Sequence, residues 1–571
     1  MGEKPIVSLH WSPAADAGAA VATDAPAAAQ PEPARSAALA TALLVGGRGP
    51  LTDRLAAALG EGTTAWRSPG LPAPLAGDRW ERPVVYVAAA RAAHGLPDPA
   101  DAELVLTAAA RAGASRVVVI ASTAVHEPSP HHPGLVEERR WRPRRSGNRI
   151  AAAWLDLERT ARAAVPRERL LVLRVAPVPL PGGDDFWSRQ LFSRLTITPL
   201  GWDPMVQLLA FDDLVAALRA AVGADLTGTF HVAPAPAPAR RAARSAGALR
   251  LAVPTPLLAL ARRLAGRPSD EVQAFVHSAT VSAAAFERAT GFAPRWSTLQ
   301  AARKNRGEEP APAAAEDPFG FDLRYRERLG RTLFRFLHRF YWRVDARGLE
   351  HVPKTGRAVL VGVHRGFQPW DGVMAQQSMH GATGRYARFL MHPGLVKMPF
   401  LAPYMTRIGG FAACRENGDW LLAQDELLGI FPEGIRGAFT RYRDSYRLTP
   451  WFRDEFAEIA IRNQAPIVPF VTIGTAETFP ILGRIDWEWW KRQSLWPYLP
   501  ITTPVPLPAK WHTRVLPPVS VDRYTPEDAD DPAKVAALAA EVREQLAAAL
   551  AGLLARRRHR FFGALAAEES S

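Results

Sequence analysis

A histidine and an aspartate seven positions apart are the residues of this sequence whose types and spacing point most clearly to chemistry. His364 and Asp371 lie in VGVHRGFQPWDG, residues 361–372, directly after an apolar run that predicts a buried strand. A histidine that takes a proton from a hydroxyl, held in its working tautomer by a carboxylate, is the acid/base half of a Ser-His-Asp triad. No serine stands nearby in a nucleophile elbow. We therefore expect the substrate's own hydroxyl to be the nucleophile, which implies acyl transfer to an alcohol.

Three further motifs follow in the C-terminal half of the chain. GGFAACRENG (409–418) contains Arg415, FPEGIRG (431–437) contains Glu433 and Arg436, and APIVPFVTIG (465–474) has the apolar character of a strand. In the second motif Gly434 allows a close backbone approach, which suits a binding loop. A plain strand-to-helix connection with a solvated Glu–Arg pair is the alternative interpretation of the same residues.

These four blocks, in this order, resemble those of the glycerolipid acyltransferases, and in particular the lysophospholipid and monoacylglycerol acyltransferase branch, over residues 319–562. The resemblance implies an α/β acyltransferase domain in which His364 is the general base and Asp371 orients it. It also implies a substrate-binding set in which Glu433, Gly434 and Arg436 meet the acceptor, Arg415 meets a glycerol-phosphate-like group, and Arg365 with Arg436 holds the phosphates of coenzyme A.

One position departs from that family pattern. The residue before the histidine is usually Asn and is Val363 here, which removes a polar neighbour of the expected base. A non-catalytic lipid-binding or scaffolding protein with decayed sites is therefore the first alternative function. Cys414, the single cysteine, has no histidine near it in sequence, and we expect it to be an inert buried thiol.

The N-terminal half has a different pattern, in which apolar strands alternate with helices from residue 38 to residue 303. The predicted strands include ALLVG, PVVYV, RVVVIAS and RLLVLRV, and strands of continuous apolar character separated by helices indicate a doubly wound parallel sheet. With VGGRG at the first turn, this region resembles the extended short-chain dehydrogenase/reductase family, that is, the NAD-dependent epimerases and dehydratases.

That resemblance implies a Rossmann-like dinucleotide fold with a degenerate site. Gly46 and Gly49 fit the first two glycines of the family's pyrophosphate turn, and Ser122 fits its helper hydroxyl. The family's catalytic Tyr and Lys correspond to Ile150 and Trp154, so NAD(P) binding is conceivable but catalytic use of it is not expected. An NAD(P)-dependent oxidoreductase or epimerase is accordingly the second alternative function.

Composition sets the remaining expectations. At 571 residues the chain needs more than one core, and its formal charge of +14 favours an anionic partner, such as CoA phosphates or anionic lipid headgroups. No nucleic-acid recognition motif and no metal-ligand spacing is present, and nothing indicates the oligomeric state. The expected organisation is a disordered Ala/Pro-rich tail (1–37), the Rossmann-like domain (38–303), a linker (304–318), the acyltransferase domain (319–562) and a tail (563–571).

Two segments suggest contact with a membrane surface. Residues 323–344 interleave Arg with Phe, Leu, Tyr and Trp, and residues 486–500 are rich in Trp, which the lipid–water interface favours. Packing of both segments inside the domain is the alternative. No stretch is apolar enough to span a bilayer and no signal peptide precedes the domains, so we expect a cytoplasmic protein at the inner face of the cell membrane. The expected reaction uses acyl-CoA or acyl carrier protein as co-substrate and requires no cofactor.

Overall fold

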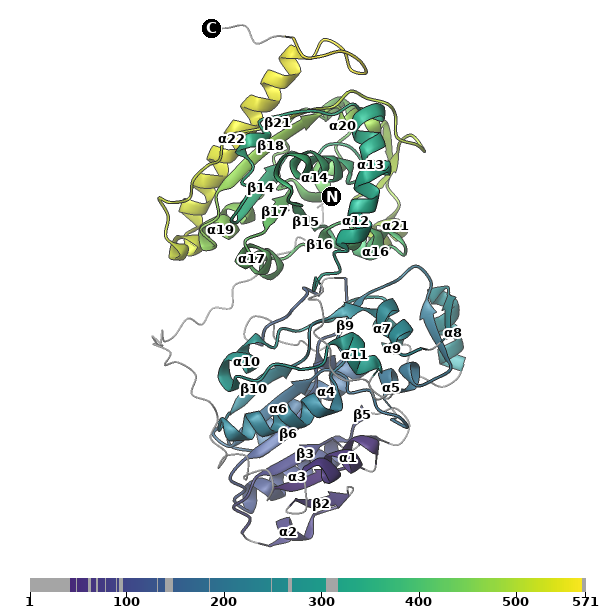
Figure 1. Cartoon of the computed structure of the whole chain (residues 1–571), viewed down its shortest axis with the longest axis vertical. Helices are drawn as coiled ribbons and strands as arrows, with labels where there is room; N and C mark the ends of the chain where they lie inside the picture. The colour runs from purple at the N-terminus through teal and green to yellow at the C-terminus, as the bar shows by residue number, and fades with distance from the viewer. Residues whose placement is uncertain are drawn as a thin grey trace, which may run out of the picture.

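Two α/β domains follow one another along the long axis of the molecule (Figure 1). The computed structural model describes residues 42–47, 49–59, 63–67, 70–77, 79–88, 90–91, 96–130, 132–138, 147–183, 185–247, 249–264, 270–303 and 317–566. The predicted N-terminal tail (1–37) and most of the predicted linker and C-terminal tail lie outside the described residues. Of the linker, Asp317 is described, and it forms an ion pair with Arg388 of the acyltransferase domain at 2.6 Å.

The N-terminal domain is built on one parallel sheet of six strands in the order β10-β7-β6-β3-β1-β2. Strand β1 lies between β2 and β3, so the chain places β2 on one side of β1 and builds the rest of the sheet on the other side. The predicted doubly wound parallel sheet is thereby confirmed. Its strands are β1 (Leu43–Gly46), β2 (Thr64–Arg67), β3 (Val84–Val87), β6 (Val117–Ser122), β7 (Leu170–Val175) and β10 (Gly228–Val232).

Helices cover both faces of this sheet, which explains why the inner strands β1, β3 and β6 are apolar and buried. One face packs against α1 (Pro50–Leu59), α6 (Phe211–Gly223) and α10 (Ala284–Thr290), and the other packs against α3 (Pro99–Arg111) and α4 (Arg149–Ala164). Capping residues fix where two of these helices begin. The side chain of Asp98 accepts a hydrogen bond at the start of α3, just before Pro99, and that of Asn148 does so at the start of α4.

Shorter elements complete the N-terminal domain and carry the contact with the second domain. They are α2 (Ala73–Ala76), β4 (Ala90–Arg91), β5 (Leu96–Pro97), η2 (Thr123–Val125), α5 (Phe186–Leu191), β8 (Leu195–Pro199), β9 (Met205–Val206), β11 (Ala237–Pro238), α7 (Ala239–Ser245), β12 (Leu249–Val253), α8 (Thr255–Leu264), α9 (Asp270–Gln273) and α11 (Thr298–Arg303). Strands β8 and β12 form a separate two-stranded parallel sheet.

The C-terminal domain contains a mixed sheet of seven strands in the order β13-β21-β18-β14-β17-β15-β16. Strands β18, β14, β17, β15 and β16 are parallel to one another, whereas β21 is antiparallel to β18. The strands are β13 (Asp345–Arg347), β14 (Ala358–Gly362), β15 (Arg388–Met391), β16 (Gly410–Ala412), β17 (Leu427–Ile430), β18 (Ile467–Ile473) and β21 (His512–Val515). Because β18, β14, β17, β15 and β16 are parallel, the motif loops that follow them meet at one edge of the sheet.

Both faces of this second sheet are also buried. One face packs against α17 (Arg415–Ala423), α19 (Glu455–Arg462) and the long α22 (Pro532–Arg556), which runs along the sheet in Figure 1, and the other packs against α14 (Trp370–Thr383). The remaining elements are α12 (Leu323–Arg331), α13 (Leu333–Phe336), η4 (Leu337–Tyr341), η5 (Leu349–His351), α15 (Pro393–Val396), α16 (Leu401–Arg407), α18 (Gly434–Ala438), η6 (Tyr442–Asp444), α20 (Thr475–Thr478), β19 (Gly483–Ile485), α21 (Glu488–Ser494), β20 (Leu499–Ile501) and η7 (Pro526–Asp530). No described helix is both long and apolar enough to cross a bilayer.

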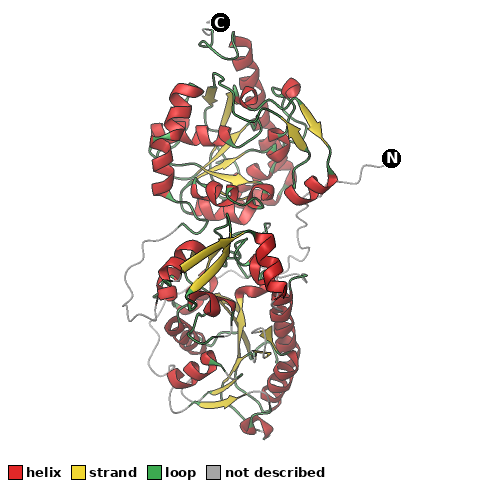
Figure 2. Ribbon diagram, turned by 90° about the vertical axis from the view of Figure 1, so that its right-hand side faces the viewer, coloured by secondary structure: helices red, strands yellow, loops and turns green. Residues whose placement is uncertain are grey.

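The two domains touch through α16 and through the start of the second domain. The amide of Phe400 donates a hydrogen bond of 2.7 Å to the carbonyl of Gly201, and Ala402 packs with Trp202 in a small apolar cluster. Phe319 lies directly against Gly134, where an added methyl group would come within 2.8 Å of the Phe319 ring. The ribbon coloured by secondary structure shows the same stacking of two layered domains from a second direction (Figure 2).

Candidate active site

His364 follows β14 and Asp371 begins α14, so one strand–loop–helix unit positions both residues. The imidazole Nδ1 of His364 lies 2.5 Å from Oδ2 of Asp371. Asp371 is 2% exposed and also accepts hydrogen bonds from the backbone amides of Arg365 (3.2 Å) and Gly372 (2.8 Å). Because an ionised carboxylate only accepts hydrogen bonds, Nδ1 carries the imidazole proton and Nε2 keeps its lone pair. This arrangement prepares Nε2 to take a proton from a bound hydroxyl.

An apolar pocket opens beside the histidine. Its cavity has a volume of about 130 Å³, and its lining includes His364, Val373, Met405, Ile408, Phe431 and Trp496. The ring of His364 stacks on Phe431 with 4.7 Å between the ring centroids. A base at the wall of an apolar cavity suits a substrate with a polar reacting group and a hydrocarbon chain.

Two glycines let neighbouring loops approach the histidine closely. A methyl group added at Gly437 would lie 2.9 Å from the carbonyl oxygen of His364, and one at Gly366, where φ is +91°, would lie 2.5 Å from the carbonyl oxygen of Thr475. Gly437 ends the FPEGIRG motif, and Thr475 begins the helix after β18. The loops after β14, β17 and β18 therefore meet around His364.

Arg365 and Glu433 form an ion pair in which neither side chain is exposed. The guanidinium donates to both carboxylate oxygens, with 2.8 Å between Nη2 and Oε1, and it also donates to the carbonyls of His364 (2.6 Å) and Arg447 (2.8 Å). The family resemblance implied that Arg365 meets a CoA phosphate and that Glu433 meets the acceptor, whereas in this structure the two buried side chains bind each other. Both side chains instead hold the loop of His364 against the loop after β17.

The other predicted binding residues lie nearer to solvent. Arg436 is exposed on α18, with its guanidinium 4.0 Å from the ring centroid of Trp451. Gly434 begins the same helix with φ of +53° and lines the pocket. Arg415 begins α17, after β16, and forms an ion pair of 2.7 Å with Glu458.

The structure also places the two residues that the sequence left in doubt. Val363 is 2% exposed and packs in the core between the sheet and α19 and α22, so its side chain points away from the pocket. A polar residue there would enter an apolar core, which explains the valine. Cys414 is half-buried before α17, and burial raises the pKa of its thiol well above the usual range, which keeps it protonated and inert.

Sequence reasoning missed two features of this edge of the sheet. His392 follows β15 and lines the same pocket, and its place directly after the short apolar run FLM (389–391) was the available signal. Glu477, 2% exposed, accepts hydrogen bonds from the hydroxyl of Tyr446 and from Arg557 (2.6 Å). This second cluster joins the loop after β18 to the end of α22, which no local pattern indicates.

The first turn of the N-terminal domain fits a dinucleotide only in part. Gly46 ends β1 with the buried side chain of Thr52 directly against it, 2.7 Å from where a Cβ would stand, whereas Gly49 has open space around it. Arg67, the last residue of β2, forms an ion pair with Asp53. These contacts fit poorly with tight NAD(P) binding at this turn.

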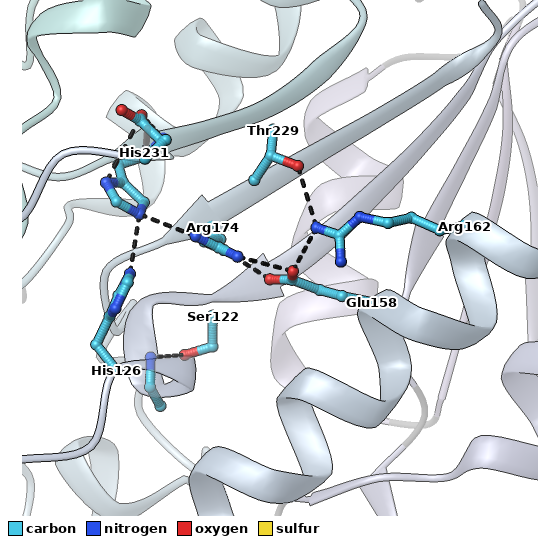
Figure 3. Close-up of polar contacts among 9 residues, drawn as sticks. Ser122, His126, Glu158, Arg162, Arg174, Thr229 and His231 are labelled. Atoms are coloured by element: carbon cyan, nitrogen blue, oxygen red, sulfur yellow. Dashed lines mark hydrogen bonds and ion pairs between the residues drawn. The ribbon is translucent and has the colours of Figure 1, made fainter. Parts of the chain in front are cut away.

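The region of the expected redox site is filled by a buried polar network instead of a Tyr–Lys pair (Figure 3). Ser122 accepts a hydrogen bond from the amide of Ala124 and thereby caps η2. Beyond it, Nε2 of His126 lies 3.0 Å from Nε2 of His231, and Arg174 donates to both carboxylate oxygens of Glu158 at 2.6 and 2.8 Å. Ile150 and Trp154 lie on α4 and supply no proton donor, so we derive no hydride-transfer step for this domain.

The histidines of this network are held neutral. Burial lowers the pKa of His132 to about 4, and burial together with the charge of Arg174 lowers that of His231 to about 3. Burial and the neighbouring His231 lower the pKa of His126 further still. Among the described residues, no group of three His, Cys, Asp or Glu side chains is placed to hold a metal ion.

Comparisons with known proteins agree with this geometry. Residues 343–473 match a family model described as Acyltransferase. An uncharacterised protein of Mycobacterium tuberculosis is 36% identical over 258 residues, covering 43% of this chain and 72% of that protein. The human DGAT1/2-independent enzyme synthesizing storage lipids is 26% identical over 158 residues, covering 28% of this chain and 48% of the human protein.

Solved structures resemble each half of the chain separately. MoeE5 in complex with UDP-glucuronic acid and NAD has a TM-score of 0.37 at 15% identity and covers 47% of this chain and 99% of its own. The 1-acyl-sn-glycerophosphate acyltransferase PlsC of Thermotoga maritima has a TM-score of 0.29 at 20% identity and covers 42% of this chain and 81% of its own. With the family match spanning His364, Asp371 and the FPEGIRG loop, the chain belongs to the acyltransferase family.

Proposed function

We propose that this protein transfers a fatty acyl group from acyl-CoA, or from acyl carrier protein, to the hydroxyl of a lysophospholipid or a partial glyceride. One observation carries the proposal: the hydrogen-bonded pair of His364 and Asp371 stands at the wall of an apolar cavity. The human relative is described as synthesizing storage lipids, which supports a lipid hydroxyl as the acceptor.

In the proposed reaction, Nε2 of His364 removes the proton of the acceptor hydroxyl while that oxygen attacks the thioester carbonyl. The carbonyl carbon becomes tetrahedral, and its collapse breaks the carbon–sulfur bond. The imidazolium returns the proton to the leaving thiolate, so the products are the ester and the free thiol. Asp371 stabilises the imidazolium during these steps, because its carboxylate is buried beside Nδ1.

The apolar pocket is the proposed place of the acyl chain. Its lining beyond His364 is formed mainly by apolar side chains of α14, β15, α15, α16 and α18 and of the residues next to them, including Leu395, Ile435 and Phe439. Arg436, exposed next to the pocket at the FPEGIRG loop, is the proposed contact for an anionic group of the donor or acceptor. The buried Arg365–Glu433 pair acts as a support of the loop rather than a ligand.

Peripheral association with the inner face of the cell membrane belongs to the same proposal. Of the two aromatic segments, residues 323–344 bury Phe334 and Trp342 but leave Phe336 and Phe340 exposed, and residues 486–500 expose Trp487 and Trp489. Exposed aromatic side chains beside cationic ones are favoured at the lipid–water interface, where the acceptor would be found.

The test is an acyl-transfer assay with the purified full chain. A labelled long-chain acyl-CoA is incubated separately with lysophosphatidate, lysophosphatidylcholine, monoacylglycerol and diacylglycerol, and ester formation is followed by mass spectrometry. We expect one acceptor class to be esterified and His364→Ala to abolish the transfer. His380→Ala is the control, because His380 lies at the end of α14 stacked on Tyr386. Full activity of the His364→Ala protein would refute the mechanism.

A further inference from the structure

A small sheet of the N-terminal domain has its polar and apolar faces reversed. In β8 the side chains of Thr196 and Thr198 are buried, 0% and 6% exposed, whereas Leu195 and Ile197 are exposed at 45% and 37%. The buried threonines are satisfied by hydrogen bonds, Thr196 to the carbonyl of Gln190 (2.8 Å) and Thr198 from Arg250 (2.7 Å). A strand at a water-facing surface normally shows the opposite alternation.

The partner strand repeats this reversal. β12 pairs in parallel with β8, and its register places Leu249 opposite Leu195 and Leu251 opposite Ile197. Leu249 is 75% exposed and Leu251 is 49% exposed, so four branched side chains stand on one outer face of the two-stranded sheet. Scattered single apolar residues are ordinary on a surface, but a contiguous set marks an interaction site.

Helix α8, which follows β12, carries a second set of exposed leucines. Leu257, Leu260 and Leu264 recur at helical spacing and are 57%, 54% and 80% exposed, whereas Leu258 on the other side of the helix is buried. We name these seven exposed side chains of β8, β12 and α8 the leucine face: Leu195, Ile197, Leu249, Leu251, Leu257, Leu260 and Leu264.

The charged residues within the segments that carry the leucine face are almost all arginines, and one of them, Arg262 of α8, is paired with the buried Glu271 of α9. Residues 194–206 and 236–264 contain a single carboxylate, Asp203, and a set of arginines, namely Arg194, Arg240, Arg241, Arg244, Arg250, Arg262 and Arg263. Asp203 is half-buried and paired with Arg240. Arg194, Arg244 and Arg263 are exposed, the first and last directly beside Leu195 and Leu264 in the chain. Apolar side chains with a cationic border fit the headgroup layer of an anionic bilayer.

The buried side of α8 packs against α16, a helix that also lines the acyl pocket. Leu258 and Trp202 pack with Ala402 of α16 in one apolar cluster. Met405 of the same helix and Ile408, which follows it, line the pocket beside His364. In Figure 1, α8 and α16 lie on the right-hand side of their respective domains.

We infer that the leucine face is a docking surface for an anionic lipid bilayer, and that the N-terminal domain thereby contributes membrane attachment in place of redox chemistry. The inference rests on the proposed function, because an enzyme that acts on lipids finds its substrates in the bilayer. Its test measures vesicle binding and does not depend on turnover. The occupant is a lipid surface because the cationic border matches anionic headgroups.

The experiment measures binding of the full chain to vesicles by co-sedimentation. Vesicles of phosphatidylcholine alone are compared with vesicles in which one third is phosphatidylglycerol. The Leu249→Gln/Leu251→Gln and Leu257→Gln/Leu260→Gln proteins test the leucine face. Leu104→Gln is the matched control, because Leu104 is 45% exposed on α3, away from this sheet. Circular dichroism and thermal unfolding establish that each variant is folded.

We expect the original chain and the control to bind vesicles that contain phosphatidylglycerol at least tenfold more strongly than vesicles of phosphatidylcholine alone. Salt at about 0.5 M should weaken the binding, because it screens surface charge. Each double variant should lose at least tenfold in partitioning. Unchanged binding of both double variants would overturn the inference. So would a change from oligomer to monomer in light scattering without loss of vesicle binding, which would assign the face to a second copy of the chain.

Acyl transfer is assayed separately on detergent-solubilised substrate to keep the two proposals apart. A chain that binds anionic vesicles through the leucine face but transfers no acyl group would contradict the proposed function and support the docking surface. A chain that is active in detergent but does not bind anionic vesicles would contradict the docking surface alone.

Discussion

The side chains of Arg365 and Glu433 join two motif loops of the acyltransferase domain through a doubly hydrogen-bonded ion pair, with neither side chain exposed to solvent. Arg365 comes from the loop after β14 and Glu433 from the loop after β17, and Oε1 of Glu433 also accepts from the amide of Thr449 at 2.8 Å. The pair therefore fixes the distance between the imidazole loop and the FPEGIRG loop.

Breaking that pair should destabilise the domain strongly. Glu433→Gln leaves a buried guanidinium without its countercharge, and removing one partner of a buried pair costs about 3 to 5 kcal/mol. Chemical unfolding measures the loss of unfolding free energy. Arg365→Met/Glu433→Leu, which removes both charges, should recover part of the stability. Equal instability of the single and double variants would contradict the pairing as the cause.

Asp371→Asn should reduce turnover and leave the fold intact. The amide cannot stabilise the imidazolium and favours the wrong tautomer of His364, and the corresponding loss in Ser-His-Asp enzymes is about 10⁴-fold in kcat. Steady-state kinetics of the purified proteins measures it. Asp454→Asn is the control, because Asp454 is exposed and makes no side-chain capping contact at α19. A variant with the kcat of the original chain would remove Asp371 from the mechanism.

Gly437→Ala should impair catalysis by displacing His364. The new methyl group would meet the His364 carbonyl oxygen at 2.9 Å, and a misplacement of about 1 Å costs on the order of 10²-fold in rate. The expected change is in kcat, with the KM for acyl-CoA little altered. Gly381→Ala is the matched control, because Gly381 lies in α14 with open space around it and the methyl group there should be harmless or stabilising. Comparable kcat values for the two variants would refute the steric argument.

The N-terminal domain should lose stability as the pH falls below 6.5. His132 and His231 have folded-state pKa values of about 4 and about 3, below the value near 6.5 of an unfolded histidine, so the unfolded chain takes up protons that the folded chain refuses. Above pH 6.5 both states are neutral at these positions and the effect vanishes. At pH 5 each histidine lowers the unfolding free energy by about 2 kcal/mol.

Hydrogen exchange of the β7 amides at pH 7.5 and pH 5.0, corrected for intrinsic rates, measures this loss within the N-terminal domain. Burial raises the pKa of Glu138, which works in the opposite direction, so the decisive quantity is a difference between proteins. His132→Phe should make the pH dependence weaker by about 2 kcal/mol than in the original chain. An unaltered pH dependence would show that His132 is not held neutral.

Addition of NAD(P)H to the full chain with sugar or acyl carbonyl substrates should give no change in nicotinamide absorbance. The region where a Tyr–Lys pair would stand holds Ile150 and Trp154, and the adjoining polar groups are bound to one another, as the pair of Arg174 and Glu158 shows. Cofactor-dependent oxidation or reduction, abolished by heat, would overturn this expectation.

The sequence alone determined the parallel sheet of the N-terminal domain and the pair at the centre of the site. The continuous apolar sequences of strands such as Val117–Ser122 and Ala358–Gly362 indicate that the strands are buried, because a parallel sheet covered on both faces leaves no polar side to its strands. His364 and Asp371 are seven positions apart across one strand–helix turn, so their meeting follows from local geometry.

Only the tertiary structure decided which motif residues touch a substrate and which hold the loops. Arg365 and Glu433 are 68 positions apart, and nothing in either motif says that the two side chains satisfy each other instead of a ligand. The exposure of the leucines of β8 and β12 could not be predicted from the sequence either, because alternation fixes which residues share a face of a strand but not which face is buried. Long-range packing makes that choice, and it lies beyond the reach of a local pattern.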